Sequence, residues 1–355
     1  MTADAFDRSR GHEGARRSGA KSRRARAVIL SIAVFLVVGI VLPEVFLRLF
    51  FDEVEVTGKY WDRGAFEGSE TLGYRHARGY SGRAFRRDAF DIRVEISEQG
   101  LRQRNTEEQA AYPRRLLLLG DSYTFGLGVS EEESFAGLLQ EPLNRLGLGV
   151  INAGQSGYGV EQGVRLGISL TGMFDPQVIL LSIFLGNDFE NDYYRTNYEN
   201  VEVKYGFRVA RDRWPRGAFF DYLRTHSYLW LLVRRIIGRA EFRVRYGEFM
   251  QLAKDDPGAA SEHTIEAVRQ LARHCRERDI VLGVMVIPGK KDWGKALYRR
   301  LLDALEEEHI PCLDLSVVPF DDSDRFKSDE HWNENGHQKA LERLIPFCRE
   351  LAKGL

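Results

Sequence analysis

The stretch that decides the fold is Arg115-Leu-Leu-Leu-Leu-Gly-Asp-Ser-Tyr-Thr-Phe-Gly126, where a continuous apolar run leads straight into glycine and polar residues. A short apolar run without polar interruption is typical of a strand that is buried on both faces. Ser122 then falls at the turn from this strand into a helix, and Asp121 is expected to stabilise that turn through backbone hydrogen bonds. The stretch therefore predicts a buried strand with a serine hydroxyl just beyond its carboxyl end.

Further short apolar runs recur along the chain and are separated by segments with helical patterning. The runs are Val150–Ile151, Val178–Leu185, Ile280–Ile287 and Cys312–Leu315. Helices are expected at Glu131–Leu146, Gly159–Phe174, Glu262–Arg278 and Asp292–His309, with a last one after Asn335. Buried strands that alternate with helices predict a parallel sheet in an α/β layered domain, and ligands bind such sheets at the carboxyl ends of the strands.

Two local patterns refine this expectation. Ser130 with Glu133 matches a capping box and is predicted to begin the helix at Glu131–Leu146. Apolar and polar residues alternate over 90–97, which predicts a half-buried strand. That strand lies in a membrane-proximal segment, residues 49–113, rich in glycine and arginine, whereas the layered domain is expected to span 114–355.

The N-terminal region predicts a membrane anchor. Residues 1–26 carry eight Lys or Arg against three acidic residues and almost nothing apolar, so this tail is expected to be disordered. Residues 27–48 are apolar and long enough to cross a bilayer as a helix. A cleaved signal is the alternative, but the run is long for it and no small-x-small site follows. The basic tail predicts a cytoplasmic N-terminus, with the remainder outside the cytoplasm at the cell (inner) membrane, periplasmic in a Gram-negative cell.

Overall composition is that of an ordinary globular protein, with 355 residues, 43% hydrophobic and 29% charged. A formal net charge of −1 gives no global basic field, so no nucleic-acid partner is expected. The three cysteines, Cys275, Cys312 and Cys348, lack metal-ligand spacing. Three buried small hydrophobic residues are favoured over one disulfide with a thiol left over. Nothing in the sequence indicates the oligomeric state.

Residues 189–250 break the alternation of strands and helices and are predicted to form a long insertion, where lids and binding loops usually occur. The insertion is crowded with aromatic residues. They include Tyr193, Tyr194, Tyr198, Tyr205, Phe207, Trp214, Phe219, Phe220, Tyr222, Tyr228 and Trp230. Its apolar stretch 229–237 is compatible with docking on the bilayer surface. An insertion that packs its own small core is the favoured alternative.

Polar residues that could take part in catalysis follow the predicted strands or precede the last helix. These groups are Gly120-Asp-Ser122, Asn152-Ala-Gly-Gln-Ser-Gly157, Gly186-Asn-Asp188 and Asp329-Glu-His331. Each is expected at the same edge of the sheet. Together they supply a nucleophile, amide donors and an Asp/His pair.

This combination meets the requirements of acyl transfer. A serine hydroxyl is a weak nucleophile, so a neutral imidazole must take its proton, and a carboxylate must orient that imidazole. We expect Ser122 as the nucleophile, His331 as the base and Asp329 as the orienting acid. The tetrahedral oxyanion needs preformed donors, each worth roughly 10²–10³ in rate. The backbone N–H groups of Ser122 and Gly157 and the side-chain amide of Asn187 are the candidates.

These four blocks, in this order, resemble those of SGNH/GDSL hydrolases. The resemblance covers roughly residues 114–352, and Gly100-Leu-Arg102 ahead of it is similar to membrane-anchored members. It implies a flavodoxin-like three-layer α/β/α fold, no cofactor, and ester substrates that are often O-acyl groups on glycans. It also implies an oxyanion hole made by Ser122, Gly157 and Asn187, with Ser122 doubling as nucleophile. No metal site is expected.

One feature departs from the commoner family pattern, Asp-x-x-His, because Asp329 and His331 are only two residues apart. Alginate O-acetyltransferase-like relatives use the shorter spacing, and residues two apart in an extended segment point the same way. Asp324 is the alternative orienting acid. His337 is the competing histidine, but it falls within the last predicted helix and is interpreted as a packing residue.

Three functions are compatible with the sequence. The first is an extracytoplasmic serine esterase that removes ester-linked acyl groups from a glycan or lipid through an acyl-serine intermediate. The second is an O-acyltransferase that modifies a cell-surface polysaccharide, in which a sugar hydroxyl resolves the same intermediate. An inactive glycan-binding relative is the third. An open, wet cleft would favour hydrolysis, and a groove lined by the aromatic residues of 189–250 would favour transfer.

Overall fold

A computed structural model shows a parallel five-stranded sheet at the centre of the protein, with strand order β11-β10-β7-β5-β6. It describes residues 23–58, 60–195, 199, 201–204, 206–210, 217–289 and 294–354. The strands are β5 (Arg114–Leu119), β6 (Leu148–Asn152), β7 (Val178–Phe184), β10 (Val281–Ile287) and β11 (Cys312–Asp314). Each predicted apolar run forms one of these strands, so the predicted α/β fold with a parallel sheet is confirmed.

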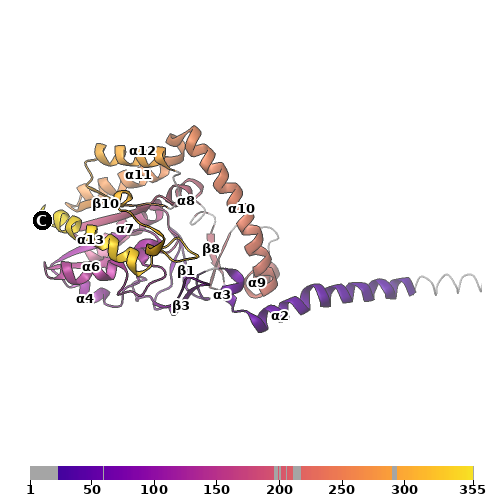
Figure 1. Cartoon of the computed structure of the whole chain (residues 1–355). Helices are drawn as coiled ribbons and strands as arrows, with labels where there is room; N and C mark the ends of the chain where they lie inside the picture. The colour runs from indigo at the N-terminus through magenta and orange to yellow at the C-terminus, as the bar shows by residue number, and fades with distance from the viewer. Residues whose placement is uncertain are drawn as a thin grey trace, which may run out of the picture.

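Helices cover both faces of the sheet (Figure 1). Along β5, Leu117 and Leu119 pack in the cluster that contains α7 (Val160–Phe174), α11 (Pro257–Arg276) and α12 (Lys295–Glu307). The alternate residues Leu116 and Leu118 pack in the cluster that contains α6 (Phe135–Asn144) and α13 (Glu334–Leu351). Because successive side chains of a strand point to opposite faces, the all-leucine strand supplies both cores of a three-layer domain.

The start of α6 differs from the prediction. Ser130 and Glu133 do exchange capping-box hydrogen bonds, from the Ser130 N–H to Glu133 Oε2 at 3.1 Å and from the Glu133 N–H to Ser130 Oγ at 3.3 Å. They close a turn, however, and the helix begins only at Phe135. Ser134 is its N-cap, with Oγ accepting from the Gly137 N–H at 3.1 Å. The predicted helix start was therefore wrong by one turn.

Other helix boundaries lie close to the predicted ones. Helix α11 begins at Pro257, five residues before the predicted start, because Asp256 caps it through the Ala259 N–H at 3.0 Å. The predicted start of α12, Asp292, lies outside the described residues. Short 3₁₀ turns occur at Leu315–Val317, Asp322–Asp324 and Ala352–Gly354.

Residues ahead of the sheet form a small β-rich layer that packs into the same core. It contains α3 (Glu53–Thr57), β1 (Phe66–Ser69), β2 (Gly73–His76), β3 (Ser81–Arg86), β4 (Phe90–Glu95) and α4 (Thr106–Ala110). Strands β3 and β4 pair antiparallel, and the predicted half-buried strand over 90–97 is β4 with its neighbours. Trp61 and Tyr74 belong to the same hydrophobic cluster as Leu117. The layer therefore packs as part of the body of the protein.

The aromatic insertion forms α8 (Asp188–Tyr194), a hairpin of β8 (Val201–Lys204) and β9 (Phe207–Ala210), then α9 (Ala218–His226) and the long α10 (Tyr228–Asp255). Phe249 is fully buried and contacts Tyr193 and Tyr194, with ring centroids 5.7 and 6.4 Å away. These residues belong to the same hydrophobic cluster as Leu117, so the insertion packs into the core of the domain, and the prediction that it packs a small core of its own is wrong. Tyr198, Tyr205 and Trp214 lie outside the described residues.

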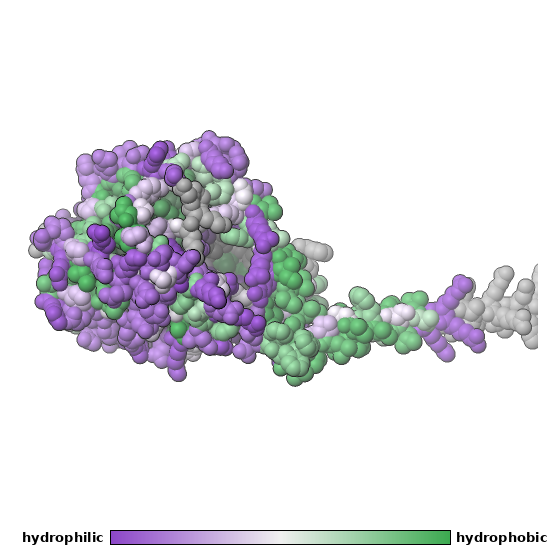
Figure 2. Space-filling model, viewed as in Figure 1, coloured by the Kyte–Doolittle hydropathy of each residue, from purple (hydrophilic) through white to green (hydrophobic). Residues whose placement is uncertain are grey.

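A single apolar helix, Arg23–Phe50, extends from the body (Figure 1). It is long and apolar enough to cross a membrane, its most apolar window is entirely unburied, and it contains a π-helical stretch, Val37–Val41, followed by α2 (Leu42–Phe50). Residues 1–22 of the predicted disordered tail lie outside the described residues. Figure 2 shows apolar side chains along this helix that continue onto the adjoining end of the body.

All three cysteines are unbonded. Cys275 and Cys348 are buried, and Cys312 is half-buried on β11. The interpretation as small hydrophobic residues therefore agrees with the structure, and the alternative of a disulfide does not.

Candidate active site

Ser122 lies where β5 gives way to the short helix α5 (Ser122–Phe125). Asp121 is the N-cap of this helix, and its Oδ1 accepts from the Tyr123 N–H at 2.9 Å, as the sequence predicts. Gly120 has φ +154°, and a Cβ there would lie 2.3 Å from Thr124 Oγ1. Glycine is therefore required for the sharp turn that leaves Ser122 at the carboxyl end of the strand.

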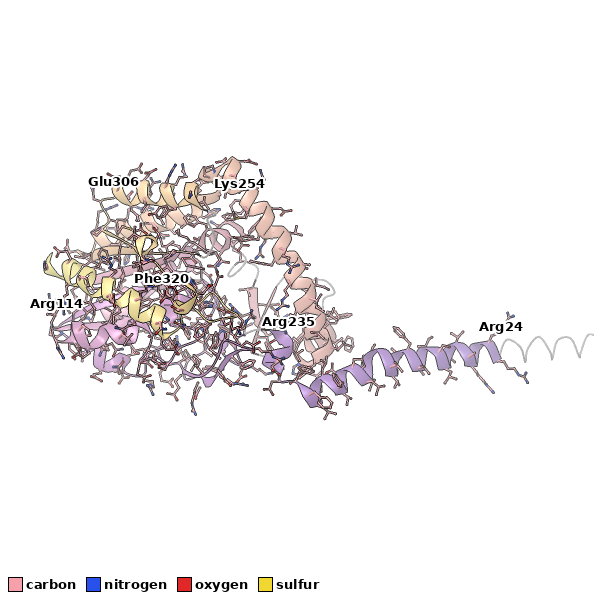
Figure 3. The ribbon with its side chains drawn as sticks, in the orientation of Figure 1. Arg24, Arg114, Arg235, Lys254, Glu306 and Phe320 are labelled. Carbon is pink, nitrogen blue, oxygen red and sulfur yellow. The ribbon has the colours of Figure 1, made fainter. Side chains whose placement is uncertain are left out.

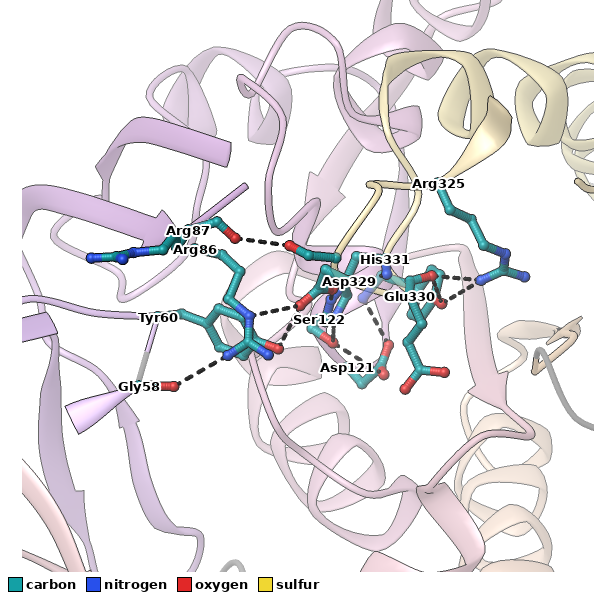
Figure 4. A network of polar contacts seen from close by, with 12 residues as sticks. Gly58, Tyr60, Arg86, Arg87, Asp121, Ser122, Arg325, Asp329, Glu330 and His331 are labelled. Carbon is teal, nitrogen blue, oxygen red and sulfur yellow. Dashed lines mark hydrogen bonds and ion pairs between the residues drawn. The ribbon is translucent and has the colours of Figure 1, made fainter. Parts of the chain in front are cut away.

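The structure brings Ser122, His331 and Asp329 into direct contact (Figure 4). Ser122 Oγ lies 2.7 Å from His331 Nε2, and His331 Nδ1 is hydrogen-bonded to Asp329 Oδ1. The His331 backbone N–H also donates to Asp329 Oδ1 at 3.0 Å, so the two residues are held in contact although they are only two positions apart. The alternative acid, Asp324, instead pairs with Lys339 Nζ at 2.7 Å. The geometry is that of a nucleophile, a base and an orienting carboxylate.

Electrostatics favour an ionised aspartate and a more basic imidazole. Burial would raise the pKa of Asp329, but the hydrogen bond and charge of His331, together with the Tyr60 hydroxyl, lower it to about 2. Burial would lower the pKa of His331, but the hydrogen bond and charge of Asp329 outweigh it and raise that pKa above its usual value. Burial raises the pKa of Asp121 to about 6. A carboxylate on Nδ1 therefore makes the imidazole a stronger base toward Ser122.

Two residues at this site were not predicted from the sequence. The Tyr60 hydroxyl donates to Asp329 Oδ2 at 2.9 Å, and Arg86 Nε lies 3.6 Å from the same oxygen. The guanidinium of Arg86 also lies over the Tyr60 ring, 5.4 Å from its centroid. Both residues come from the layer ahead of the sheet, so only folding brings them to Asp329, and no local motif marks them.

The loop that carries His331 is held on both sides. Arg325 Nη1 donates to the Glu330 carbonyl at 2.6 Å and to the Tyr123 hydroxyl at 2.9 Å. Trp332 is fully buried and stacks on Phe320 with centroids 4.8 Å apart. Because these contacts fix the backbone next to His331, the imidazole is preorganised for Ser122.

His337 lies within α13, away from this contact. It is buried, and its Nδ1 accepts from the Phe135 N–H at 3.2 Å. Burial lowers its pKa to about 3, so this imidazole stays neutral. The packing role predicted for His337 agrees with these contacts.

Gly157 lies in the loop after β6 with φ +82°, and a Cβ there would lie 3.0 Å from the Tyr74 hydroxyl. The loop is held in place at Ser156, the residue before Gly157, because the Tyr74 hydroxyl donates to the Ser156 carbonyl at 3.0 Å. The Ser156 N–H donates to Nε2 of buried His76 at 3.4 Å. Burial lowers the pKa of His76 to about 3, which keeps the imidazole neutral as an acceptor. The layer ahead of the sheet therefore shapes this loop.

Asn187 is the N-cap residue of α8, directly after β7. Its side chain makes no hydrogen bond within the described part of the chain, although its Oδ1 is buried. Asp188 stabilises the turn, with Oδ2 accepting from the Phe184 N–H at 2.8 Å. The oxyanion roles of Ser122, Gly157 and Asn187 stay predictions.

Comparison with known proteins identifies the family. Residues 118–339 match the model of the GDSL-like lipase/acylhydrolase family. The chain belongs to this family. The resemblance to SGNH/GDSL hydrolases is thereby confirmed, and the protein is an enzyme that hydrolyses ester bonds. No group of three or more metal-ligating side chains occurs among the described residues.

A search of solved structures found proteins that are similar to part of this chain. TesA shares 16% identity over 67% of this chain and 99% of its own, with a TM-score of 0.42. The psychrotrophic esterase EstA from Pseudoalteromonas sp. shares 12% over 68% and 99%, with a TM-score of 0.42. The Clostridium thermocellum family 3 carbohydrate esterase shares 14% over 68% and 98%, with a TM-score of 0.40. No curated protein matches the chain.

Proposed function

We propose that this GDSL-family enzyme is a membrane-anchored, extracytoplasmic serine esterase that acts on ester-linked acyl groups of a glycan or lipid. One observation carries the proposal: Ser122 Oγ lies 2.7 Å from His331 Nε2, while the other ring nitrogen bonds Asp329. A serine, imidazole and carboxylate joined in this way perform acyl transfer through a covalent intermediate.

In the first half of the reaction, His331 Nε2 takes the Ser122 proton as Oγ attacks the ester carbonyl. The N–H groups of Ser122 and Gly157 and the Asn187 amide stabilise the oxyanion. Collapse breaks the bond to the alcohol oxygen, which takes the proton from His331, and the acyl group stays on Ser122. In the second half, His331 takes a proton from water as the water oxygen attacks the acyl-serine. Collapse of this intermediate breaks the bond from the acyl carbon to Ser122 Oγ, which takes the proton back from His331, and the carboxylic acid is released.

Hydrolysis is proposed ahead of transfer to a polysaccharide because the chain matches a family of lipases and acylhydrolases. The described aromatic residues of the insertion do not form one exposed set. Tyr193 and Tyr194 pack against buried Phe249, whereas Phe219 and Tyr222 on α9 are exposed.

The proposed location rests on the apolar helix Arg23–Phe50 and the basic residues before it. Positive charge is retained on the cytoplasmic side of a membrane, so the domain that contains Ser122 is expected outside the cytoplasm. A reporter that works only outside the cytoplasm should be active when it is fused after Leu355. Activity of a reporter that works only in the cytoplasm would reverse this orientation.

The catalytic proposal is tested by p-nitrophenyl acetate hydrolysis with the full chain in detergent. Ser122→Ala should lower turnover by about 10⁴-fold or more, because the nucleophile is lost. Ser169→Ala is the matched control, since its hydroxyl bonds only the Leu166 carbonyl in α7. Equal turnover by the Ser122→Ala and Ser169→Ala variants would show that another group carries the reaction.

A further inference from the structure

A pocket of about 330 Å³ lies beside the active site. Its wall contains four arginines from two separate parts of the chain. Arg86 and Arg87 come from the end of β3, and Arg235 and Arg239 come from α10. Ser328, the neighbour of Asp329 in sequence, also lines the pocket, and its hydroxyl donates to the Arg87 carbonyl at 2.8 Å.

Positive charge in this pocket exceeds negative charge. Glu55 is the only acidic residue among the described residues of the wall, and it pairs with Arg87 at 2.7 Å. Arg235 Nη1 donates only to the backbone carbonyl of Glu55, at 2.6 Å. Arg239 has no acidic partner within the described ranges. The carboxylate that faces Arg86, Asp329, is already bonded to His331.

The protein makes room for this concentration of charge. Gly58 has φ +61°, and a Cβ there would lie 2.5 Å from Arg235 Nε. Burial, followed by the charges of Arg239, Arg86 and Arg87, lowers the pKa of Arg235. Guanidinium groups that repel one another are stabilised by a shared anion, whose oxygens accept hydrogen bonds from several of them.

The pocket also lies at the end of the body where the apolar helix begins. Phe51 lines it and directly follows α2. Figure 3 places Arg235 on α10 at that end. Val233 and Ile236 on α10 are exposed, and apolar side chains continue here from the helix onto the body (Figure 2). If Arg23–Phe50 crosses the bilayer as proposed, the four arginines lie near the lipid headgroups.

We propose that this pocket binds a phosphate-bearing anion beside the active site, the source of which is either an anionic lipid headgroup or a soluble phosphate compound. A phosphate suits four guanidinium groups better than a single carboxylate ligand would, because it carries more negative charge and more oxygens that accept hydrogen bonds. The membrane-side placement depends on the proposed anchor, whereas the anion site depends only on the contacts of the pocket. Through Arg86 and Ser328, the bound anion adjoins the segment that carries Asp329.

The test measures thermal unfolding of the full chain in non-ionic detergent while inorganic phosphate replaces chloride at constant ionic strength. Phosphate should raise the unfolding midpoint in a saturable way. The double variant Arg235→Gln/Arg239→Gln should weaken the apparent phosphate affinity about tenfold or more, since it removes two charge-assisted contacts. Arg243→Gln, an exposed arginine further along α10 and outside the pocket, is the matched control and should leave the affinity unchanged.

Equal phosphate affinity in the parent and the double variant would overturn the proposal. If the double variant does not fold, Arg239→Gln alone changes an exposed side chain and should still weaken binding about threefold or more. A second arm uses nanodiscs of phosphatidylcholine with or without phosphatidylglycerol. Loss of the phosphate-dependent shift when phosphatidylglycerol is present would assign the site to a lipid headgroup, and its persistence to a soluble ligand. Both readouts report binding, so they stand apart from p-nitrophenyl acetate hydrolysis.

Discussion

Asp329 is the residue on which orientation of the base depends. Its side chain is 3% exposed, and it accepts from both His331 and Tyr60. Asp329→Asn should lower kcat for p-nitrophenyl acetate by about 10⁴-fold, because an amide favours the wrong imidazole tautomer. Asp324→Asn is the control, since that carboxylate pairs with Lys339. A comparable loss at Asp324 alone would move the orienting role there.

The protonation state of His331 sets the expected pH dependence. Because Asp329 raises the pKa of this imidazole, aided by the charges of Asp121 and Glu330, the ring becomes neutral only above its usual range. A base must be neutral to accept the Ser122 proton, so kcat/KM should rise with pH and level off after an inflection above about 6.5. In Asp329→Asn the inflection should move to lower pH. An inflection that stays fixed in this variant would show that another group titrates.

At this scale the sequence identified the residues that carry chemistry but not those that support them. Ser122 and His331 stand in blocks whose order along the chain is informative, so each was predicted and the two are in contact. Tyr60 and Arg86 occur in no such block. Their contacts to Asp329 span 269 and 243 positions of the chain for the hydroxyl and the guanidinium, respectively, and only the folded layer ahead of the sheet brings them together.

At the scale of elements, Arg102 fastens the loop that follows the nucleophile helix. It is 2% exposed, and its guanidinium donates to the backbone carbonyls of Phe125, Gly126 and Val129. Burial lowers its pKa to about 10, so it stays charged at neutral pH. Arg102→Ala removes the side-chain donor of three backbone carbonyls, of which only that of Gly126 keeps a backbone donor, the Val129 N–H at 3.4 Å, and should cost about 3 kcal/mol of unfolding free energy.

Urea unfolding measures this change, and Arg104→Ala supplies the control. Arg104 is half-exposed and pairs with surface acids, so its loss should cost less than about 1 kcal/mol. Equal losses for the two variants would contradict the fastening role of Arg102.

The elements themselves were largely predictable because their signals are local. Five apolar runs gave five strands: β5, β6, β7 and β10 are largely buried, and the edge strand β11 is half-buried. The start of α6 was not, because two N-cap candidates lie within five residues and both form their hydrogen bonds. Ser134 is the N-cap in the structure, with an extended backbone that is followed directly by helical residues, and the Ser130–Glu133 bonds close a turn ahead of it.

At the scale of the whole molecule, Glu44 is one of the residues that fasten the apolar helix to the body, beside Arg48, whose guanidinium donates to the His226 carbonyl. Glu44 accepts from the Ser227 hydroxyl at 2.9 Å and from the N–H groups of Tyr228 and Leu229 at 3.0 and 2.9 Å. These are donors at the first turn of α10, which lack partners within their own helix and attract negative charge. Beside them Leu47 packs with Leu231 in a small apolar cluster. The position of α10, and with it Arg235, is thus coupled to the apolar helix.

Glu44→Ala tests that coupling. The first-turn amides of Tyr228 and Leu229 lose their acceptor, so their hydrogen exchange in the full chain in detergent should accelerate about tenfold or more. Glu248→Ala, an exposed acid further along the same helix, should leave these amides unchanged. Because Ser227 would still cap Trp230 at 3.1 Å, the rest of α10 should keep its protection. Unchanged exchange at Tyr228 and Leu229 would mean that packing of Leu47 alone fixes the helix, and acceleration along all of α10 would mean that Glu44 holds the whole insertion.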